Sequence, residues 1–221
     1  MIKKILLVVS FVWVTACASQ AQTVQDIFGN PNYTVTWFGI DYSHSKIVGT
    51  VSQFGGKEPV TAKELRDRYY AEWNQLVLDE PEKYTLAKMI DHKTIIKDIR
   101  MMNDLNAAAS LDSMEVAATP YYTREQIQGF VSAYTVPQKP GIGLVFITEC
   151  MNKPYAAAYY HVVFFNTETK KVLYQERLPG VVSGIGIRNY WATSFYNVMQ
   201  DVQNERYASW RKRFGAYKPA K

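Results

Sequence analysis

The chain has 221 residues, of which 48% are hydrophobic and 20% charged, with a formal net charge of +5. This length suits one domain with a substantial core, and the composition excludes a disordered chain and a collagen-like repeat. Loss of Lys3 and Lys4 with the leader described below lowers the charge by 2 to +3. That excess is too small to predict nucleic-acid binding.

Residues 1–16 have the composition of a signal peptide. Lys3 and Lys4 form a basic start, and residues 5–14 form an apolar run that is too short to span a bilayer. The sequence VTAC, which ends at Cys17, resembles the bacterial lipobox, in which small residues precede a cysteine that becomes acylated and N-terminal. We therefore expect export and lipidation of Cys17. Cleavage after Ala21 by ordinary signal peptidase is the alternative.

Residues 17–32 form a tether between the leader and the folded domain. No acidic sorting cluster follows Cys17, a pattern that in bacterial lipoproteins generally indicates an outer-membrane protein facing the periplasm. A soluble periplasmic or secreted protein is the alternative. Either cleavage leaves Cys150 without an intramolecular disulfide partner, and its place at the end of an apolar run predicts that it is buried.

Residues 33–217 are predicted to form a single α/β domain. Residues 33–42 alternate with bulky groups on both faces, which is typical of an interior strand. A helix begins after Thr61, which forms a capping box with Glu64, and it ends at the acidic run near Asp79.

The middle of the chain gives mixed signals. The apolar spacing in residues 84–110 predicts a helix in the first half, a short strand near Thr94 and a helix over residues 99–109. Residues 113–119 alternate as a strand would. A second capping box, Thr123 with Gln126, begins a helix that is stopped by the prolines beyond Tyr134.

The last third carries the clearest pattern. Strands are expected over residues 142–148, 156–166 and 171–178, and a long helix over residues 188–214. The chain is therefore predicted to form a mixed sheet that ends in a three-strand meander, with helices packed on it.

A glycine-rich turn joins the last strand to the last helix. Gly184-x-Gly186 is similar to a phosphate-binding loop, but Asn189 replaces the third glycine and a hairpin precedes the turn. We therefore expect the glycines to serve backbone packing. The alternative is an anion or polar-ligand site that uses Arg188, Asn189 and Tyr190.

Asp41, Ser43 and His44 form the one triad-like group in the sequence. Neighbouring residues on an extended segment point to opposite faces, so Ser43 and His44 would not readily meet, and a hydrolase using Asp41 and His44 is the minor alternative. The three histidines have no metal-binding spacing, and His161 alternates with apolar strand residues as a packed histidine would. We expect neither a metal nor a cofactor.

Exposed aromatic and basic residues are the remaining candidates. Tyr121, Tyr122 and Tyr155 are expected in loops, where they could contact a glycan or a peptide. Basic residues gather after residue 205, which is typical of a solvated helix end, with contact to anionic lipid as the alternative.

Residues 162–198, together with residues 37–49 and 71–84, resemble a group of uncharacterised exported proteins of Bacteroides-type bacteria. The group has a Phe-Phe-Asp-like turn, where this chain has Asn166, and a Gly-x-Gly-x-Arg-Asn-Tyr-Trp entry to the last helix. The resemblance implies no activity. The order of elements is more distantly similar to the TolB N-terminal-like fold of envelope lipoproteins that activate peptidoglycan synthases.

These observations favour a lipid-anchored envelope protein that binds a protein partner or a cell-wall or glycan ligand. An enzyme is less favoured, because no credible catalytic cluster is visible. A structural envelope protein without a small ligand is the third alternative.

Overall fold

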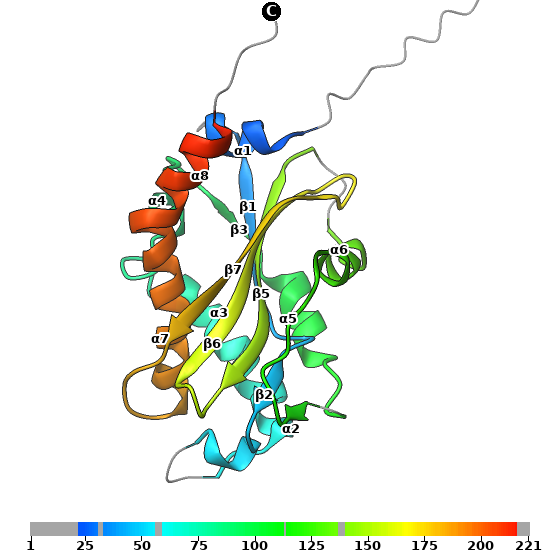
Figure 1. Ribbon diagram of the computed structural model, residues 1–221, viewed down its shortest axis with the longest axis vertical. Helices are drawn as coiled ribbons and strands as arrows, with labels where there is room; N and C mark the ends of the chain where they lie inside the picture. The colour runs from blue at the N-terminus through cyan, green and yellow to red at the C-terminus, as the bar shows by residue number, and fades with distance from the viewer. Residues whose placement is uncertain (1–21, 31–32, 56–58, 113, 137–139, 216–221) are drawn as a thin grey trace, which may run out of the picture.

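The computed structural model describes residues 22–30, 33–55, 59–112, 114–136 and 140–215 (Figure 1). The predicted leader, Cys17 and the first part of the tether lie outside these residues. The described part is a mixed α/β fold in which helices cover both faces of a seven-stranded sheet. The predicted fold class is confirmed. In the described ranges, no helix is both long and apolar enough to cross a membrane.

The sheet is built around β5 (Ile142–Asn152), whose eleven residues are all buried. Antiparallel strands β6 and β7 follow on one side, which confirms the predicted meander. On the other side, β1 and β2 pair in parallel with the first and second halves of β5, and β3 and β4 flank them. The remaining strands are β1 (Val35–Asp41), β2 (Lys46–Val48), β3 (Ile96–Lys97), β4 (Glu115–Val116), β6 (Ala157–Asn166) and β7 (Val172–Val181).

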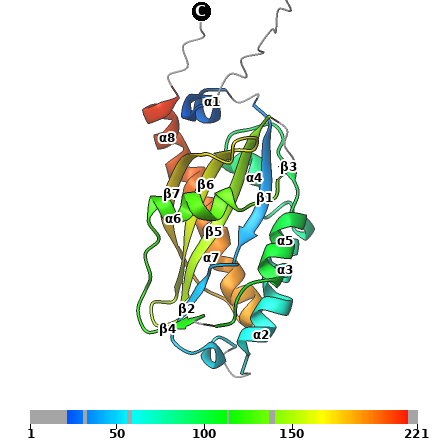
Figure 2. The same ribbon diagram turned by 90° about the vertical axis from the view of Figure 1, so that its right-hand side faces the viewer.

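Two layers of helix enclose the sheet. Figure 2 shows α6 lying across one face, with α7 behind the opposite face. We call the α7 side the first face and the α6 side the second face. The α-helices are α1 (Val24–Gly29), α2 (Ala62–Glu64), α3 (Tyr70–Asp79), α4 (Leu86–Met89), α5 (Arg100–Ala107), α6 (Arg124–Ser132), α7 (Ile187–Asp201) and α8 (Tyr207–Phe214); π-helical turns at Leu65–Tyr69 and Val202–Arg206 join α2 to α3 and α7 to α8, and Val51–Gln53 forms a 3-10 turn.

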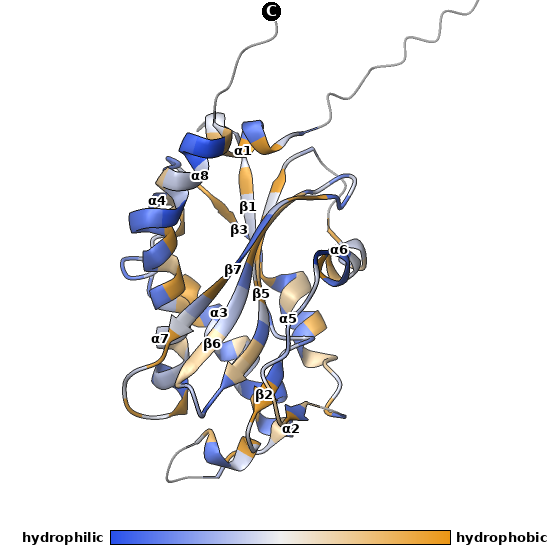
Figure 3. Ribbon diagram, in the orientation of Figure 1, coloured by the Kyte–Doolittle hydropathy of each residue, from blue (hydrophilic) through white to orange (hydrophobic). Residues whose placement is uncertain are grey.

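The long C-terminal helix is continuous from α7 through the π turn to α8, as the sequence predicted. Hydrophobic and hydrophilic segments alternate along it in Figure 3, because one side is buried and the other faces solvent. The predicted stripe of Trp191, Phe195, Val198 and Val202 is buried in the larger core on the first face.

The smaller core on the second face lies between the sheet and α6. Ile127, Val131 and Tyr134 pack there against Val145 and other residues of the central strands. The capping box that begins α6 is present, with Thr123 Oγ accepting from the Gln126 amide and Gln126 Oε1 accepting from the Thr123 amide. The cap at Thr61 likewise accepts from the Glu64 amide.

The predicted alternation in β1 is wrong beyond Phe38. Phe38 is an extra residue in the register between Trp37 and Gly39, and Gly39 has a φ of 114°, a value that favours glycine. Ile40 therefore packs in the same core as Trp37, whereas Phe38 packs in the smaller core. The bulge also turns Asp41 toward the second face.

Strand β7 is longer than predicted, because Pro179 and Gly180 belong to it and not to the following turn. Proline is tolerated there because β7 is an edge strand. The expected packing role holds for Gly180, since a Cβ on it would stand 2.1 Å from the Ser194 carbonyl oxygen of α7. Gly184 and Gly186 have open surroundings but positive φ angles of 105° and 77°.

Candidate functional site

Two irregularities meet at the centre of the sheet. Strands β1 and β2 share the neighbour β5, but residues 42–45 interrupt them, so that Asp41 pairs with Ile147 and Lys46 with Cys150. On the opposite side of β5, the register with β6 skips Glu149. A bulge of this kind re-aims a side chain out of the regular alternation. Here Glu149 keeps the alternation of Ile147, so its carboxylate lies on the second face, and the bulge re-aims Met151, which packs in the larger core.

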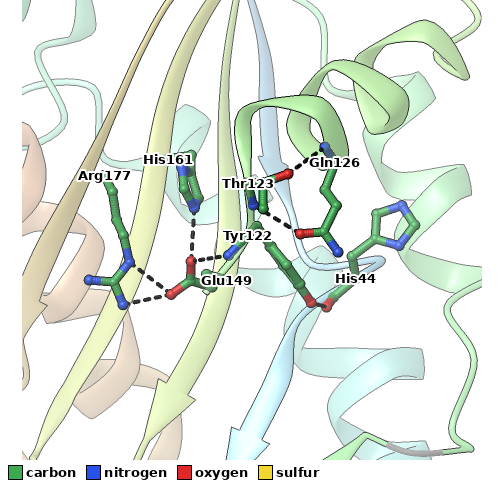
Figure 4. A network of polar contacts seen from close by, with 7 residues as sticks. All are labelled: His44, Tyr122, Thr123, Gln126, Glu149, His161 and Arg177. Atoms are coloured by element: carbon green, nitrogen blue, oxygen red, sulfur yellow. Dashed lines mark hydrogen bonds and ion pairs between the residues drawn. The ribbon is translucent and has the colours of Figure 1, made fainter. Parts of the chain in front are cut away.

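Glu149 is fully buried and accepts four hydrogen bonds (Figure 4). Arg177 donates to Oε1 through Nε at 2.8 Å and Nη2 at 2.6 Å. His161 Nε2 lies 3.0 Å from Oε2, and the Tyr122 backbone amide donates to Oε2 at 2.9 Å. Burial alone raises the pKa of Glu149, but these donors outweigh burial and leave the pKa below its usual value. The carboxylate is therefore ionised and paired at neutral pH.

Tyr122 connects this network to the interruption between β1 and β2. Its backbone amide holds Glu149, and its hydroxyl donates to the His44 carbonyl oxygen. Burial raises the pKa of Tyr122 to about 12, so the hydroxyl stays protonated and remains a donor. One residue therefore fixes two segments that lie far apart in the sequence.

The outer side of the network is a partly exposed aromatic surface. The Arg177 guanidinium carbon lies 4.1 Å from the ring centre of Tyr159 and 5.6 Å from that of Tyr121. Tyr121 is 71% exposed. Strand register places Pro179 and Val181 on the same face as Arg177, and both are exposed. We call Tyr121, Tyr159, Arg177, Pro179 and Val181 the tyrosine–arginine face.

This face is the half of the second sheet face that α6 leaves uncovered. Helix α6 packs over the end of the sheet where β7 begins, through Gln128, which accepts from the Val172 amide. Arg177 to Val181 follow toward the other end of β7, beyond the reach of that contact. Within the described ranges, Nη1 of Arg177 makes no hydrogen bond, so donors remain available at the surface.

Asp41, Ser43 and His44 do not form a catalytic chain. The Asp41 carboxylate accepts from the Ser43 amide and hydroxyl and from the Tyr134 hydroxyl at 2.6–2.7 Å. The His44 ring instead stacks on Phe130 with 3.7 Å between ring centres, and in Figure 4 it points away from Glu149. Burial lowers the pKa of His44, against the opposing effect of Asp41. The Ser43 hydroxyl thus donates to the Asp41 carboxylate and not to the His44 imidazole.

Arg188, Asn189 and Tyr190 begin α7 beside a cleft of about 660 Å³ that the Gly184–Asn189 loop lines together with Arg68 and Tyr69. Arg188 donates to Asn189 Oδ1 at 3.2 Å and lies 3.9 Å from Glu80. The Tyr190 ring lies 4.2 Å from the Lys153 ammonium. These side chains already contact other residues of the same chain, and a ligand role for them stays a prediction.

The three loop tyrosines lie in different places. Tyr121 belongs to the tyrosine–arginine face, whereas Tyr122 is mostly buried. Tyr155 is 72% exposed in the turn between β5 and β6, where its amide donates to Asn152 Oδ1. The structure therefore brings one of the three to Arg177.

Cys150 is buried, as predicted, and burial raises the pKa of its thiol to about 12, which disfavours a nucleophilic role. His161 is buried, also as predicted, but its hydrogen bond to Glu149 and the ion pair of Glu149 with Arg177 were missed. No local signal marked them, because Glu149 follows the predicted strand over residues 142–148 and the run 171–178 carries three charged residues. In the described residues, no group of three His, Cys, Asp or Glu side chains is placed to hold a metal ion.

No protein-family model, curated protein or solved structure matches this chain.

Proposed function

We propose that this protein is an exported, lipid-anchored envelope protein that binds a cell-wall or other glycan ligand on the tyrosine–arginine face. The observation that carries the proposal is the half-uncovered sheet face, where the exposed Tyr121 ring and the partly exposed Tyr159 ring flank a guanidinium fixed by a buried carboxylate. Export, Cys17 acylation and a periplasm-facing outer-membrane location belong to the same proposal and are supported by the leader sequence.

The chemistry of this face suits a sugar chain. Tyrosine rings offer rigid apolar surfaces on which the C–H faces of sugar rings can pack, at a small entropy cost. Arg177 offers N–H donors for hydroxyl oxygens, while its charge is balanced by Glu149. This internal neutralisation weakens attraction for free anions and leaves directional hydrogen bonding as its main contribution.

The rigidity of the network supports binding in a second way. Arg177 is held by two charge-assisted hydrogen bonds and by the Tyr159 ring, so it would lose little side-chain freedom when a ligand arrives. A preorganised donor beside solvent-accessible rings is a common feature of recognition surfaces. The geometry at Asp41 and His44 gives no comparable support for a hydrolase.

Binding can be tested by affinity electrophoresis and pull-down with neutral soluble polysaccharides and purified peptidoglycan sacculi. We expect Tyr121→Ala to weaken binding roughly tenfold, in line with the loss of an exposed aromatic contact. Ile96→Ala is the matched control, because Ile96 is 54% exposed on β3, at the opposite edge of the sheet. If the protein retains none of these glycans but captures an envelope protein through the same face, the ligand is a protein partner and not a glycan.

The anchor is tested separately by cell fractionation. Cys17→Ala should move the protein out of the salt-washed membrane fraction, because the acyl chains attach through that thiol. Unchanged partitioning after the salt wash would contradict the lipid anchor and favour cleavage after Ala21.

A further inference from the structure

The end of the fold that the tether enters is also its most basic end. Helix α1, which begins at Val24, packs against α8, where Phe28 contacts Trp210 and Phe214. Figures 1 and 2 show α1 and α8 side by side at one end of the molecule. The last turns of α8 carry Arg211, Lys212 and Arg213, all exposed. We call these three residues the basic end.

The charge of the basic end is only partly balanced. Arg211 pairs with Asp91, and the nearby Asp26 is held by the Thr23 amide and hydroxyl. Lys212 and Arg213 form no ion pair with any residue the structure describes. The favourable effect of cations on a helix C-terminus accounts for their presence in the sequence. It does not account for their position beside the entry of a lipid tether.

The length of chain between Cys17 and the first described residue limits how far this end can stand from a membrane. Five peptide units separate Cys17 from Gln22, the first residue described, and they reach at most about 18 Å. Electrostatic attraction to a charged surface acts over a Debye length of about 8–10 Å at physiological salt. A lipid on Cys17 would therefore allow the basic end to come within this range of anionic headgroups, because even a fully extended link is only about twice the Debye length.

We infer that Lys212 and Arg213, with Arg211, form a contact surface for anionic phospholipid, which holds the domain in one orientation on the membrane. The inference rests on the lipid anchor of the proposed function. The acyl chains would hold the protein at the membrane without fixing its orientation, whereas the basic end adds attraction to anionic headgroups on one side of the domain, so the two would act together. The tyrosine–arginine face, toward the opposite end of β7, would then point away from the bilayer.

The test uses the mature chain without acyl groups and measures co-sedimentation with vesicles of phosphatidylcholine, with and without phosphatidylglycerol. We expect binding to the phosphatidylglycerol vesicles alone, and its loss in high salt. Lys212→Gln/Arg213→Gln should weaken this binding roughly 25-fold, at about fivefold for each charge removed near the surface. The matched control is Lys63→Gln/Arg68→Gln, which removes two exposed helix cations from the α2 end.

Three outcomes would overturn the inference: equal binding to both vesicle types, equal losses for the two variants, or a fall in thermal stability of the Lys212/Arg213 variant with unchanged vesicle binding. The last result would leave these residues as helix-end cations only. Release of the wild-type protein from membranes by high salt alone would contradict the lipid anchor but would not change the vesicle result. Failure of the anchor and failure of the basic end are therefore distinguishable.

Discussion

Arg177→Leu tests how much the ion pair between Arg177 and the buried Glu149 carboxylate contributes to the stability of the fold. The change removes two hydrogen bonds, at 2.8 and 2.6 Å, from a Glu149 side chain that is fully buried. Breaking a buried ion pair by removing one partner costs about 3–5 kcal/mol. Because Arg177 is 26% exposed and the His161 and Tyr122 donors remain, we expect the free energy of unfolding to fall by about 3 kcal/mol, the lower end of this range. A chain of this size should then lose roughly 6–12 °C in melting temperature.

The pH dependence of this loss of stability shows whether the loss arises from the unpaired charge of Glu149 or from lost packing contacts. In the wild type, the lowered pKa of Glu149 contributes stability that is present above the unfolded-state pKa and is lost as the pH falls through the folded-state pKa. Without Arg177, burial should dominate and raise that pKa. The stability gap between wild type and variant should therefore be largest at pH 7 and narrow as the pH falls toward 4, where the variant carboxyl takes up a proton.

The measurement is urea unfolding of both proteins between pH 7 and pH 4, with two further variants. Glu149→Gln/Arg177→Leu should recover most of the loss, because an uncharged amide oxygen can still accept from His161 and the Tyr122 amide. Arg68→Leu removes an exposed pair with Glu72 and should cost less than about 1 kcal/mol. A gap that does not change with pH, or a double variant no more stable than Arg177→Leu, would refute the reasoning.

Three further changes test the packing around the site. Gly180→Ala places a Cβ 2.1 Å from the Ser194 carbonyl oxygen and should destabilise the fold by about 3 kcal/mol. Gly129→Ala places a Cβ in a helix with no atom within 4 Å and should stabilise the fold by about 0.5–1 kcal/mol. Thermal unfolding that shifts the stability of both variants in the same direction would contradict this. Tyr134→Phe removes a 2.6 Å bond to buried Asp41 and should cost about 1.5–3 kcal/mol in urea unfolding; a neutral result would mean that Asp41 finds another donor.

Local signals predicted the elements well. The capping residues Thr61 and Thr123 marked two helix starts, and the apolar stripe beginning at Trp191 marked the buried side of α7. These signals succeeded because each depends on neighbours within one or two turns of helix. The β1 register failed because the bulge at Phe38 is stabilised from a distance, by the Asn74 side chain bonding to both the amide and the carbonyl of Ile40.

The candidate site could not be assembled from the sequence for a related reason. Glu149 and Arg177 meet because β6 carries the chain back between β5 and β7, which brings residues of two distant segments to the same face of the sheet. Nothing in the local pattern distinguishes such a buried carboxylate from a solvent-facing one. Adjacency in the chain pointed instead to Asp41 and His44, whose side chains turn to different partners.

The continuous helix from Ile187 to Phe214 has a mechanical consequence. Its 15 residues in α7, five in the π turn and eight in α8 give a rod about 40 Å long. The rod begins at the glycine-rich turn and ends at Phe214, next to α1 and the tether. In the proposed arrangement this rod would act as a spacer, and its length would set the height of a bound ligand above the bilayer.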